Sequence, residues 1–360
     1  MTKTTVAGVL AMAVAGGVAM LDAQGGGRGA GPRPPGATGP GRVEQITVHG
    51  KSLEGNLEGD SPDRDVTVYL PPSYAGDQSR RFPVVYLLHG YGGRENTFTE
   101  RLASLLESSD RLAVAQGFSS AIVVTPSAYT LHKGAMYSNS PTTGDWERFI
   151  AEDLVAYMDS HYRTLPSRLS RGLAGHSMGG YGALKIGMKR PDVFGALYVM
   201  SACCLTANRN PRPESMAAAA AITTREQAEE AARAPGFGPS TTLASAAAWS
   251  PNPKNPPLYL DLPVGDQQQA VLARWAANAP LAFLDQYVRD LRLYRAIAID
   301  VGDQDGLRAD AGKLHDALTN YGIANDFEIY PGTHTSDVAV RFQEHVLPFF
   351  SRTLLFDPAK

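Results

Sequence analysis

One pentapeptide, Gly-His-Ser-Met-Gly at residues 175–179, constrains the fold of this chain more than any other stretch. The preceding residues 169–174 are predicted to form a short strand, and residues 181–189 a helix that stops before Pro191. A strand that enters a helix through Gly-x-Ser-x-Gly forms the nucleophile elbow, a tight turn in which the serine takes a strained backbone conformation. Residues larger than its two glycines would collide with the neighbouring strand and helix. The chain holds 36 glycines, so the pattern alone can arise by chance, but its strand and helix context favours the elbow. We therefore expect the Ser177 hydroxyl to stand clear of the backbone at the carboxyl end of a strand.

Strand-like and helix-like segments alternate along most of the chain. Residues 82–88 are continuously apolar, as expected of a strand that is covered on both faces. Two alternating segments, 43–48 and 64–70, are predicted to open the sheet as an antiparallel pair. The order predicts an α/β protein with a mostly parallel, doubly wound sheet, in which ligands bind outside the carboxyl ends of the strands. Further strands are predicted at 121–124, 196–200, 296–299 and 326–330, and helices at 98–106, 145–162, 309–321 and 338–350.

The alternation is interrupted between residues 208 and 286, where no strand is predicted. This stretch contains one predicted helix, 225–233, and a proline-dense segment, 251–257. A long stretch between two sheet strands is usually an insertion, and such insertions often act as lids over a site. We expect aromatic residues of this insertion, Trp249 and Tyr259 in particular, to line the substrate cleft. The alternative is a decoration that packs away from the site.

The N-terminal residues have the pattern of an export signal. Lys3 precedes an apolar run over residues 6–21, and a small residue followed by a polar one comes after it. This predicts a secretory signal peptide over residues 1–23 and a secreted or periplasmic protein. The run is short and contains glycines, which disfavours stable membrane insertion. Residues 24–42 are rich in Gly, Pro, Ala and Arg and are expected to form a disordered linker before a domain at 43–357.

Chain order supplies a base for Ser177. A serine hydroxyl needs a base that takes its proton and an acid that orients the base, and after an elbow these follow in the order serine, acid, histidine. His334 comes directly after the strand predicted at 326–330, whereas its rivals His315 and His345 lie within predicted helices. We therefore expect His334 to be the base.

For the acid, two aspartates compete in the turn that follows the strand predicted at 296–299. Asp303 and Asp305 both stand in this turn, and Asp300, still on the strand, is a weaker third candidate. Position alone does not decide between the first two, because either carboxylate can also stabilise a turn by accepting bonds from nearby N–H groups.

The oxyanion that develops during attack by the serine needs preformed N–H donors. One candidate is the backbone N–H of Met178, which directly follows the serine. The other is the N–H of Tyr91 in the glycine-rich loop 89–93, at the end of a buried strand. His89 and His176 are of a catalytic residue type, but their positions favour structural roles in fixing the loop and in packing beside the serine.

Composition disfavours several other classes of function. The formal net charge of −3 argues against a nucleic-acid or anionic-membrane surface. The sequence contains no His-Glu-x-x-His, no cysteine cluster and no Gly-x-x-x-x-Gly-Lys loop, so neither a metal nor a nucleotide cofactor is expected. The only cysteines, Cys203 and Cys204, are adjacent, which disfavours a disulfide and favours two small apolar residues ending a buried strand. None of these features sets an oligomeric state.

Five short segments together carry a resemblance to a known group of enzymes. The segments are 87–96, 144–150, 174–180, 302–305 and 332–334. Jointly they resemble the esterase D and antigen 85-like serine esterases, which include S-formylglutathione hydrolases, enterochelin esterases and carbohydrate esterases such as bacterial feruloyl esterases. The resemblance spans nearly all of the chain from about residue 65 to residue 350, except the insertion.

This resemblance implies an α/β-hydrolase fold and a serine carboxylic-ester hydrolase that forms an acyl-enzyme on Ser177 without a cofactor. The acid of the family is the last residue of a Gly-x-x-Asp turn, which corresponds to Asp305, and its oxyanion donors correspond to Tyr91 and Met178. Trp146, within the second segment, is a further candidate for substrate binding. The implied substrate is a small-molecule or carbohydrate-linked ester, with feruloyl and acetyl esters as candidates.

Two departures limit what the resemblance implies. Many relatives carry a tryptophan shortly after the histidine, whereas Thr-Ser-Asp occupies residues 335–337 here. The insertion at 208–286 also has no counterpart in the smallest feruloyl esterases. Two other functions share the fold: an acyltransferase of the antigen 85 type, in which a sugar hydroxyl replaces water, and a non-catalytic module that binds carbohydrate. The complete set of serine, aspartate and histidine disfavours the second.

Overall fold

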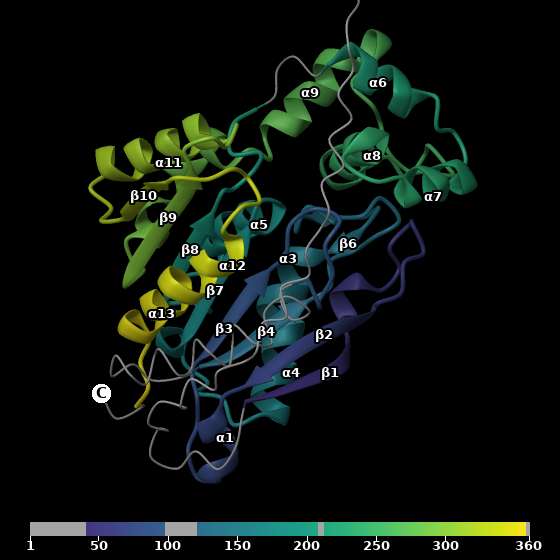
Figure 1. Cartoon of the computed structure of the whole chain (residues 1–360). Coiled ribbons are helices and arrows are strands. Elements are labelled where there is room, and N and C mark those ends of the chain that lie inside the picture. The colour runs from purple at the N-terminus through teal and green to yellow at the C-terminus, as the bar shows by residue number, and fades with distance from the viewer. Residues whose placement is uncertain (1–40, 98–120, 208–211, 358–360) are drawn as a thin grey trace, which may run out of the picture. The chain divides into compact units, whose positions relative to one another are not determined.

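The computed structural model describes residues 41–97, 121–207 and 212–357. An eight-stranded sheet with the strand order β1-β2-β4-β3-β7-β8-β9-β10 forms its centre (Figure 1). β2 pairs antiparallel with β1 and β4, and every other neighbouring pair is parallel. The predicted α/β class with a mostly parallel sheet is therefore confirmed. The strands are β1 (Arg42–His49), β2 (Asp63–Leu70), β3 (Val84–Leu88), β4 (Ile122–Pro126), β7 (Arg171–His176), β8 (Ala196–Met200), β9 (Ala296–Gly302) and β10 (Asp326–Tyr330), and a separate ribbon pairs β5 (Asn139–Ser140) with β6 (Gly144–Asp145).

Helices connect the parallel strands, and several further helices lie between β8 and β9. Their bounds are α1 (Pro72–Gly76), α3 (Trp146–Arg148), α4 (Leu154–His161), α5 (Met178–Lys189), α6 (Pro213–Ala220), α7 (Arg225–Arg233), α8 (Gly238–Trp249), α9 (Gln268–Ala276), α10 (Val288–Leu291), α11 (Arg308–Asn320), α12 (Val338–Arg341) and α13 (Leu347–Thr353). Wider turns at Phe149–Asp153 and Phe342–Val346 join α3 to α4 and α12 to α13, so the helices predicted at 145–162 and 338–350 are each continuous. Short 3-10 turns lie at Lys51–Leu53, Arg168–Ser170, Gly265–Gln267, Pro280–Ala282 and Leu284–Tyr287.

Three sequence predictions fall on residues that the structure does not describe. These are the signal peptide at 1–23, the linker up to residue 40 and the helix at 98–106. Among the helices that the structure does describe, none combines the length and the apolar character that a membrane span requires.

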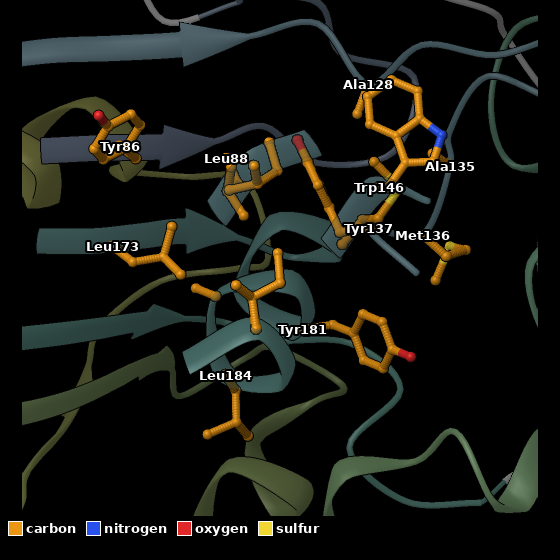
Figure 2. Close-up of a cluster of buried hydrophobic side chains, with 14 of the residues drawn as sticks. Tyr86, Leu88, Ala128, Ala135, Met136, Tyr137, Trp146, Leu173, Tyr181 and Leu184 are labelled. Carbon is orange, nitrogen blue, oxygen red and sulfur yellow. The ribbon is translucent and has the colours of Figure 1, made fainter. Parts of the chain in front are cut away.

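Side chains of the central strands alternate between two hydrophobic clusters. On β3, Tyr86 belongs to the first cluster, whereas Val85 and Leu87 belong to the second. All five β3 residues are fully buried, as the unbroken apolar run predicted. The first cluster continues into α4 and α5, and part of it is shown in Figure 2. The second cluster is completed by side chains of the C-terminal helices, which include Phe349 and Phe350.

The strand that leads into the elbow is shifted from its predicted position. Residues 168–170 form a 3-10 turn, and β7 begins only at Arg171 and runs to His176. The following helix α5 begins at Met178 instead of residue 181. β7 pairs with β3 on one side and with β8 on the other. Its last residue, His176, directly precedes Ser177.

The insertion is more helical than its sequence pattern indicated. It contains α6, α7, α8 and α9, of which only α7 was predicted (Figure 1). The start of α7 has a capping box, in which Thr224 and Gln227 exchange hydrogen bonds. In contrast, α8 opens with Gly-Pro-Ser and then buries most of its surface, so it lacks the polar face that makes a helical period visible.

Candidate active site

Ser177 lies at the junction of β7 and α5 with a backbone conformation that few non-glycine residues adopt. Its φ and ψ angles are 58° and −114°. The main chain around it is held on both sides: its N–H donates to the carbonyl of Met200 at 3.0 Å, and its carbonyl accepts from Tyr181 at 3.0 Å and from Cys203 at 3.1 Å. The strained turn is therefore fixed by the surrounding structure, as the elbow pattern predicted.

Two glycines make the turn sterically possible. A Cβ atom on Gly175 would lie 2.2 Å from the carbonyl oxygen of Gly179, and a Cβ atom on Gly179 would lie 2.0 Å from that of Leu88. Both distances are far below van der Waals contact with main-chain atoms that cannot rotate away. The requirement for small residues at these positions is confirmed.

The structure brings Ser177, His334 and Asp305 into one hydrogen-bonded row. Nε2 of His334 is 2.9 Å from the Ser177 hydroxyl oxygen, and Nδ1 is 2.8 Å from Oδ2 of Asp305. The other oxygen of Asp305 accepts from the Leu307 N–H at 2.9 Å. The three side chains come from loops after β7, β9 and β10, which are parallel strands whose carboxyl ends meet at one edge of the sheet. The carboxylate is 2% exposed, whereas the imidazole is 27% exposed, so only the latter can be reached by a substrate.

The rival aspartates have other partners. Oδ1 of Asp303 accepts a hydrogen bond from the Gly332 N–H at 2.9 Å. This bond joins the loop after β9 to the loop after β10, so Asp303 has the structural role of a carboxylate that stabilises a turn. Asp300 lies beneath the site, where it accepts from the Tyr198 hydroxyl and from Arg341, both at 3.0 Å. Its burial raises its pKa to about 6. Neither carboxylate contacts His334 in the structure.

The remaining histidines near the site are structural. Nδ1 of His89 is 2.8 Å from the Gly90 carbonyl, and its Nε2 accepts from the Ala128 N–H at 2.8 Å. Burial lowers the pKa of His89 to about 4, so the ring is neutral and links the glycine loop to the chain after β4. His176 donates through Nε2 to the carbonyl of His334 at 2.8 Å, and its ring packs 4.9 Å from that of His334. His176 therefore supports the main chain of His334, and burial lowers the pKa of His176 to about 4 as well.

The two expected oxyanion donors come from the first residue of α5 and from the glycine loop next to Ser177. Met178 is the first residue of α5, so its N–H has no partner within the helix. Tyr91 follows Gly90, at which an added Cβ would lie 3.4 Å from the Ser177 Cβ. Over the described parts of the chain, neither N–H donates to a backbone carbonyl. The Tyr91 hydroxyl donates to the carbonyl of His132 at 2.9 Å, which holds the loop in place.

A cleft of about 630 Å³ opens over these groups. It combines the glycine loop, the serine and histidine, and the first turn after the histidine. Among the described residues it is lined by Gly90, Tyr91, Gly92, Gly93, Asn96, Thr97, His176, Ser177, Phe237, His334, Thr335, Asp337, Val338, Ala339 and Val340.

Phe237 is the residue through which the insertion reaches the cleft. Its ring stacks on Tyr91 with centroids 5.9 Å apart and planes at 22°, and the residue is 62% exposed. The Lys133 ammonium group donates to the carbonyls of Ala234 and Gly236, both at 3.0 Å, and so holds the preceding turn. Sequence reasoning missed Phe237 because it stands between two helices, outside any periodic pattern.

The structure places none of the predicted substrate-binding residues at the cleft. Trp146 is 1% exposed and lies in the core cluster of Figure 2, where its ring packs edge-on against Phe149 and its Nε1 donates to the Thr143 carbonyl. The large apolar ring of Trp146 is more stable in this buried position than in an open cleft, where water would contact it.

The predictions for Trp249 and Tyr259 are also wrong, because neither residue belongs to the lining of the cleft. Trp249 is 9% exposed and packs between Tyr181 and Trp275, with ring centroids 5.6 and 6.0 Å away. Tyr259 has a φ of 53° in a turn, where its N–H donates to the carbonyl of Asn255 at 2.8 Å. The apolar ring of Trp249 joins the insertion to the core through Tyr181, and this packing accounts for its position.

Comparison with known proteins assigns the family. Residues 61–346 match the family model described as "Putative esterase". The chain belongs to this esterase family. Two curated proteins show the relationship in sequence: an endo-1,4-beta-xylanase/feruloyl esterase of Xylanibacter ruminicola, 29% identical over 161 residues, and an esterase of Mycobacterium tuberculosis, 35% identical over 128 residues. The first match covers 43% of this chain and 21% of that protein, and the second covers 34% and 26%. The chain thus spans about a quarter or less of these relatives.

A solved structure shows the relationship in fold. A ferulic acid esterase superposes with a TM-score of 0.63 at 23% identity, covering 88% of this chain and 99% of that one. The predicted α/β-hydrolase fold and the resemblance to serine esterases are both confirmed.

Proposed function

We propose that this member of the esterase family hydrolyses carboxylic esters through an acyl-enzyme on Ser177. The observation that carries the proposal is the row of contacts from Asp305 through His334 to Ser177, at 2.8 and 2.9 Å. A serine hydroxyl is a weak nucleophile until a base removes its proton, and Nε2 of His334 is within hydrogen-bond reach of that proton.

Hydrolysis would proceed in two steps that use the same imidazole. Ser177 Oγ attacks the ester carbonyl carbon while Nε2 of His334 takes its proton, and this proton then passes to the leaving alcohol oxygen. In the second step Nε2 takes a proton from a water molecule that attacks the acyl carbon. The bond between this carbon and Ser177 Oγ then breaks, the proton passes from Nε2 to Oγ, and the carboxylic acid leaves. Asp305 accepts from Nδ1–H, which keeps Nε2 free to accept a proton and stabilises the imidazolium.

The backbone N–H groups of Tyr91 and Met178 are proposed to bind the oxyanion. Met178 directly follows the serine in the sequence, and the ring of His89 holds the glycine loop that carries Tyr91. Donors fixed before the reaction need no reorganisation in the transition state, and removal of one such donor typically costs about 3–4 kcal/mol of barrier.

The lining of the cleft supports a division between acyl and alcohol groups. Phe237, Val338 and Val340 are apolar, and Phe237 and Val340 are also well exposed. The lining also contains the polar residues Asn96 and Asp337. We assign the apolar part to the acyl group and the polar part to an alcohol such as a sugar. The similarity to an endo-1,4-beta-xylanase/feruloyl esterase and to a ferulic acid esterase supports an ester linked to carbohydrate.

Domain organisation and export are part of the proposal. Residues 1–23 are proposed to be a secretory signal peptide, residues 24–42 a linker, and residues 43–357 the hydrolase domain. The insertion at 208–286 would act as one wall of the cleft through Phe237. The composition of the N-terminus supports export. Mass spectrometry of the protein recovered from the medium or periplasm should show a chain that begins near residue 24, and an uncut chain retained in the cytoplasm would contradict export.

The central experiment measures p-nitrophenyl acetate hydrolysis by the purified protein and by Ser177→Ala. We expect turnover by the wild type that is lost in the variant, with Ser160→Ala on the exposed face of α4 as a matched control. Activity that persists in Ser177→Ala would overturn the proposal. An added alcohol that becomes the main acyl acceptor would identify a transferase instead of a hydrolase.

A further inference from the structure

Cys203 and Cys204 are not placed as their sequence predicted. β8 ends at Met200, and both cysteines lie beyond it in the following loop, partly exposed and with free thiols. Their sulfur atoms are 2.8 Å apart. Successive side chains of an extended strand point to opposite sides, so this loop has a conformation that turns two neighbouring side chains towards each other.

The backbone of this loop is strained at two non-glycine positions. Ser201 has a φ of 41° and Cys204 a φ of 60°, in the left-handed region that such residues rarely occupy. The loop is held at both ends: the Ser201 N–H donates to the carbonyl of Asp300 at 2.8 Å, and the Leu205 carbonyl accepts from Leu281 at 3.0 Å. Strain of this kind persists only where the surroundings impose it, and it gathers at functional sites and switches.

We propose that Cys203 and Cys204 form a reversible redox site that closes to a vicinal disulfide on reaction with a low-molecular-weight disulfide. One thiolate attacks the oxidant, displaces one of its sulfurs as a thiolate and forms a mixed disulfide. The second cysteine thiolate then attacks the mixed disulfide and displaces the other sulfur. The cysteine pair loses two protons and two electrons, and the oxidant becomes two thiols.

Covalent geometry explains why this disulfide would open again readily. Adjacent Cα atoms are about 3.8 Å apart across a trans peptide bond. Ordinary disulfides join Cα atoms roughly 4.4–6.8 Å apart, and departures from that range store strain that makes the bond more reducible. Strained disulfides are the labile, regulatory ones.

The pair is linked to the elbow by the main chain. The Cys203 N–H donates to the Ser177 carbonyl at 3.1 Å. The neighbouring Ala202 packs against the elbow helix, since an added Cβ on Gly180 would lie 3.0 Å from it. The ring that the disulfide closes contains the peptide between Cys203 and Cys204, and the peptide just before it carries this N–H. A change in the ring therefore reaches the Ser177 carbonyl through the backbone angles of Cys203, so the position of Ser177 depends on the oxidation state. This coupling rests on the proposed esterase function.

The test begins with the covalent state of the protein. The reduced chain is incubated with oxidised glutathione, denatured, alkylated with iodoacetamide and digested with trypsin, which releases residues 190–209 with both cysteines. We expect this peptide to escape alkylation and to be about 2 Da lighter than the dithiol form, with dithiothreitol reversing the change. Alkylation or glutathionylation of both cysteines, or a disulfide between two chains, would overturn the proposal.

The second arm measures the consequence for the elbow. Oxidation should lower kcat for p-nitrophenyl acetate by at least about threefold, because small displacements of a nucleophile are costly. Dithiothreitol should restore the rate, and Cys204→Ser should keep one rate under both treatments. An oxidised peptide with an unchanged rate would refute the coupling to Ser177. If the wild type hydrolyses no ester at all, the proposed function fails, while the peptide masses still decide the redox site.

Discussion

Replacing Asp305 with asparagine turns one hydrogen-bond acceptor of the proposed active site into a donor and changes the size of the side chain very little. Oδ1 of Asp305 accepts from the Leu307 N–H at 2.9 Å, and Oδ2 lies 2.8 Å from Nδ1 of His334. In Asp305→Asn the amide oxygen must stay on the Leu307 N–H, because that N–H needs an acceptor. The NH₂ group then faces Nδ1 and donates to it. Nδ1 becomes an acceptor, so the ring proton moves to Nε2, which can no longer take the proton of Ser177.

The size of the effect follows from losing the correct tautomer. Where an enzyme with this arrangement loses it, kcat falls by about 10³–10⁴. This corresponds to about 4–5.5 kcal/mol of activation free energy. Binding should change little, because the carboxylate is 2% exposed and does not line the cleft.

Steady-state kinetics on p-nitrophenyl acetate would measure this loss, with thermal unfolding as a check on folding. Asp303→Asn is the matched control, since Oδ1 of Asp303 accepts from the Gly332 N–H and an amide oxygen can do the same. We expect the control to retain at least about a third of the wild-type kcat. If Asp305→Asn stays within tenfold of wild type, or if Asp303→Asn is the variant that loses activity, the assignment of the acid is wrong.

Three further predictions concern the elbow, the cleft and the buried histidines. Gly179→Ala should lower the free energy of unfolding by at least about 3 kcal/mol, since its Cβ would meet a main-chain oxygen at 2.0 Å. Gly312→Ala, in α11 with no atom within 4 Å of its added Cβ, should raise it by about 0.5–1 kcal/mol, and equal effects in urea titrations would contradict the steric argument. Phe237→Ala should lower kcat/KM for an ester with a bulky apolar acyl group by about tenfold and leave acetate within about threefold; equal losses for both would exclude Phe237 from acyl recognition. Burial lowers the pKa of both His89 and His176 from 6.5 to about 4, so the stability that their neutral rings contribute is present above pH 6.5 and is lost as the pH falls through 4. Urea unfolding should therefore show a free energy that declines by up to about 3 kcal/mol per histidine between pH 6.5 and 4, and a flat profile over that window would contradict the assignment.

Local patterns determined much of the architecture. The elbow was predictable because Gly-x-Ser-x-Gly between a strand and a helix is a local signal, and the steric limit at Gly175 is set by Gly179, four residues further on. The parallel sheet followed from the alternation of strand and helix, since apolar runs such as β3 must be covered on both faces. His334 followed from chain order alone, because a histidine in a loop after a strand reaches the same sheet edge as the serine.

Tertiary packing decided what depends on partners far away in the chain. From the residues alone, Asp303 and Asp305 were equivalent, and the structure separates them by which carboxylate faces His334, 29 positions further on. The insertion shows the same limit. Trp249 packs in the interior against Trp275. Phe237, which belongs to no periodic pattern in the sequence, stacks on Tyr91 at the cleft.

The two cysteines show this limit within a single loop. Their adjacency was visible in the sequence and indicated two buried apolar residues. Their facing sulfur atoms arise only because the loop is held from β9 and from the segment after α9, by hydrogen bonds to Asp300 and from Leu281. Adjacent residues can point apart or together, and that choice depends on backbone angles imposed by contacts nearly a hundred residues away, which no local pattern encodes.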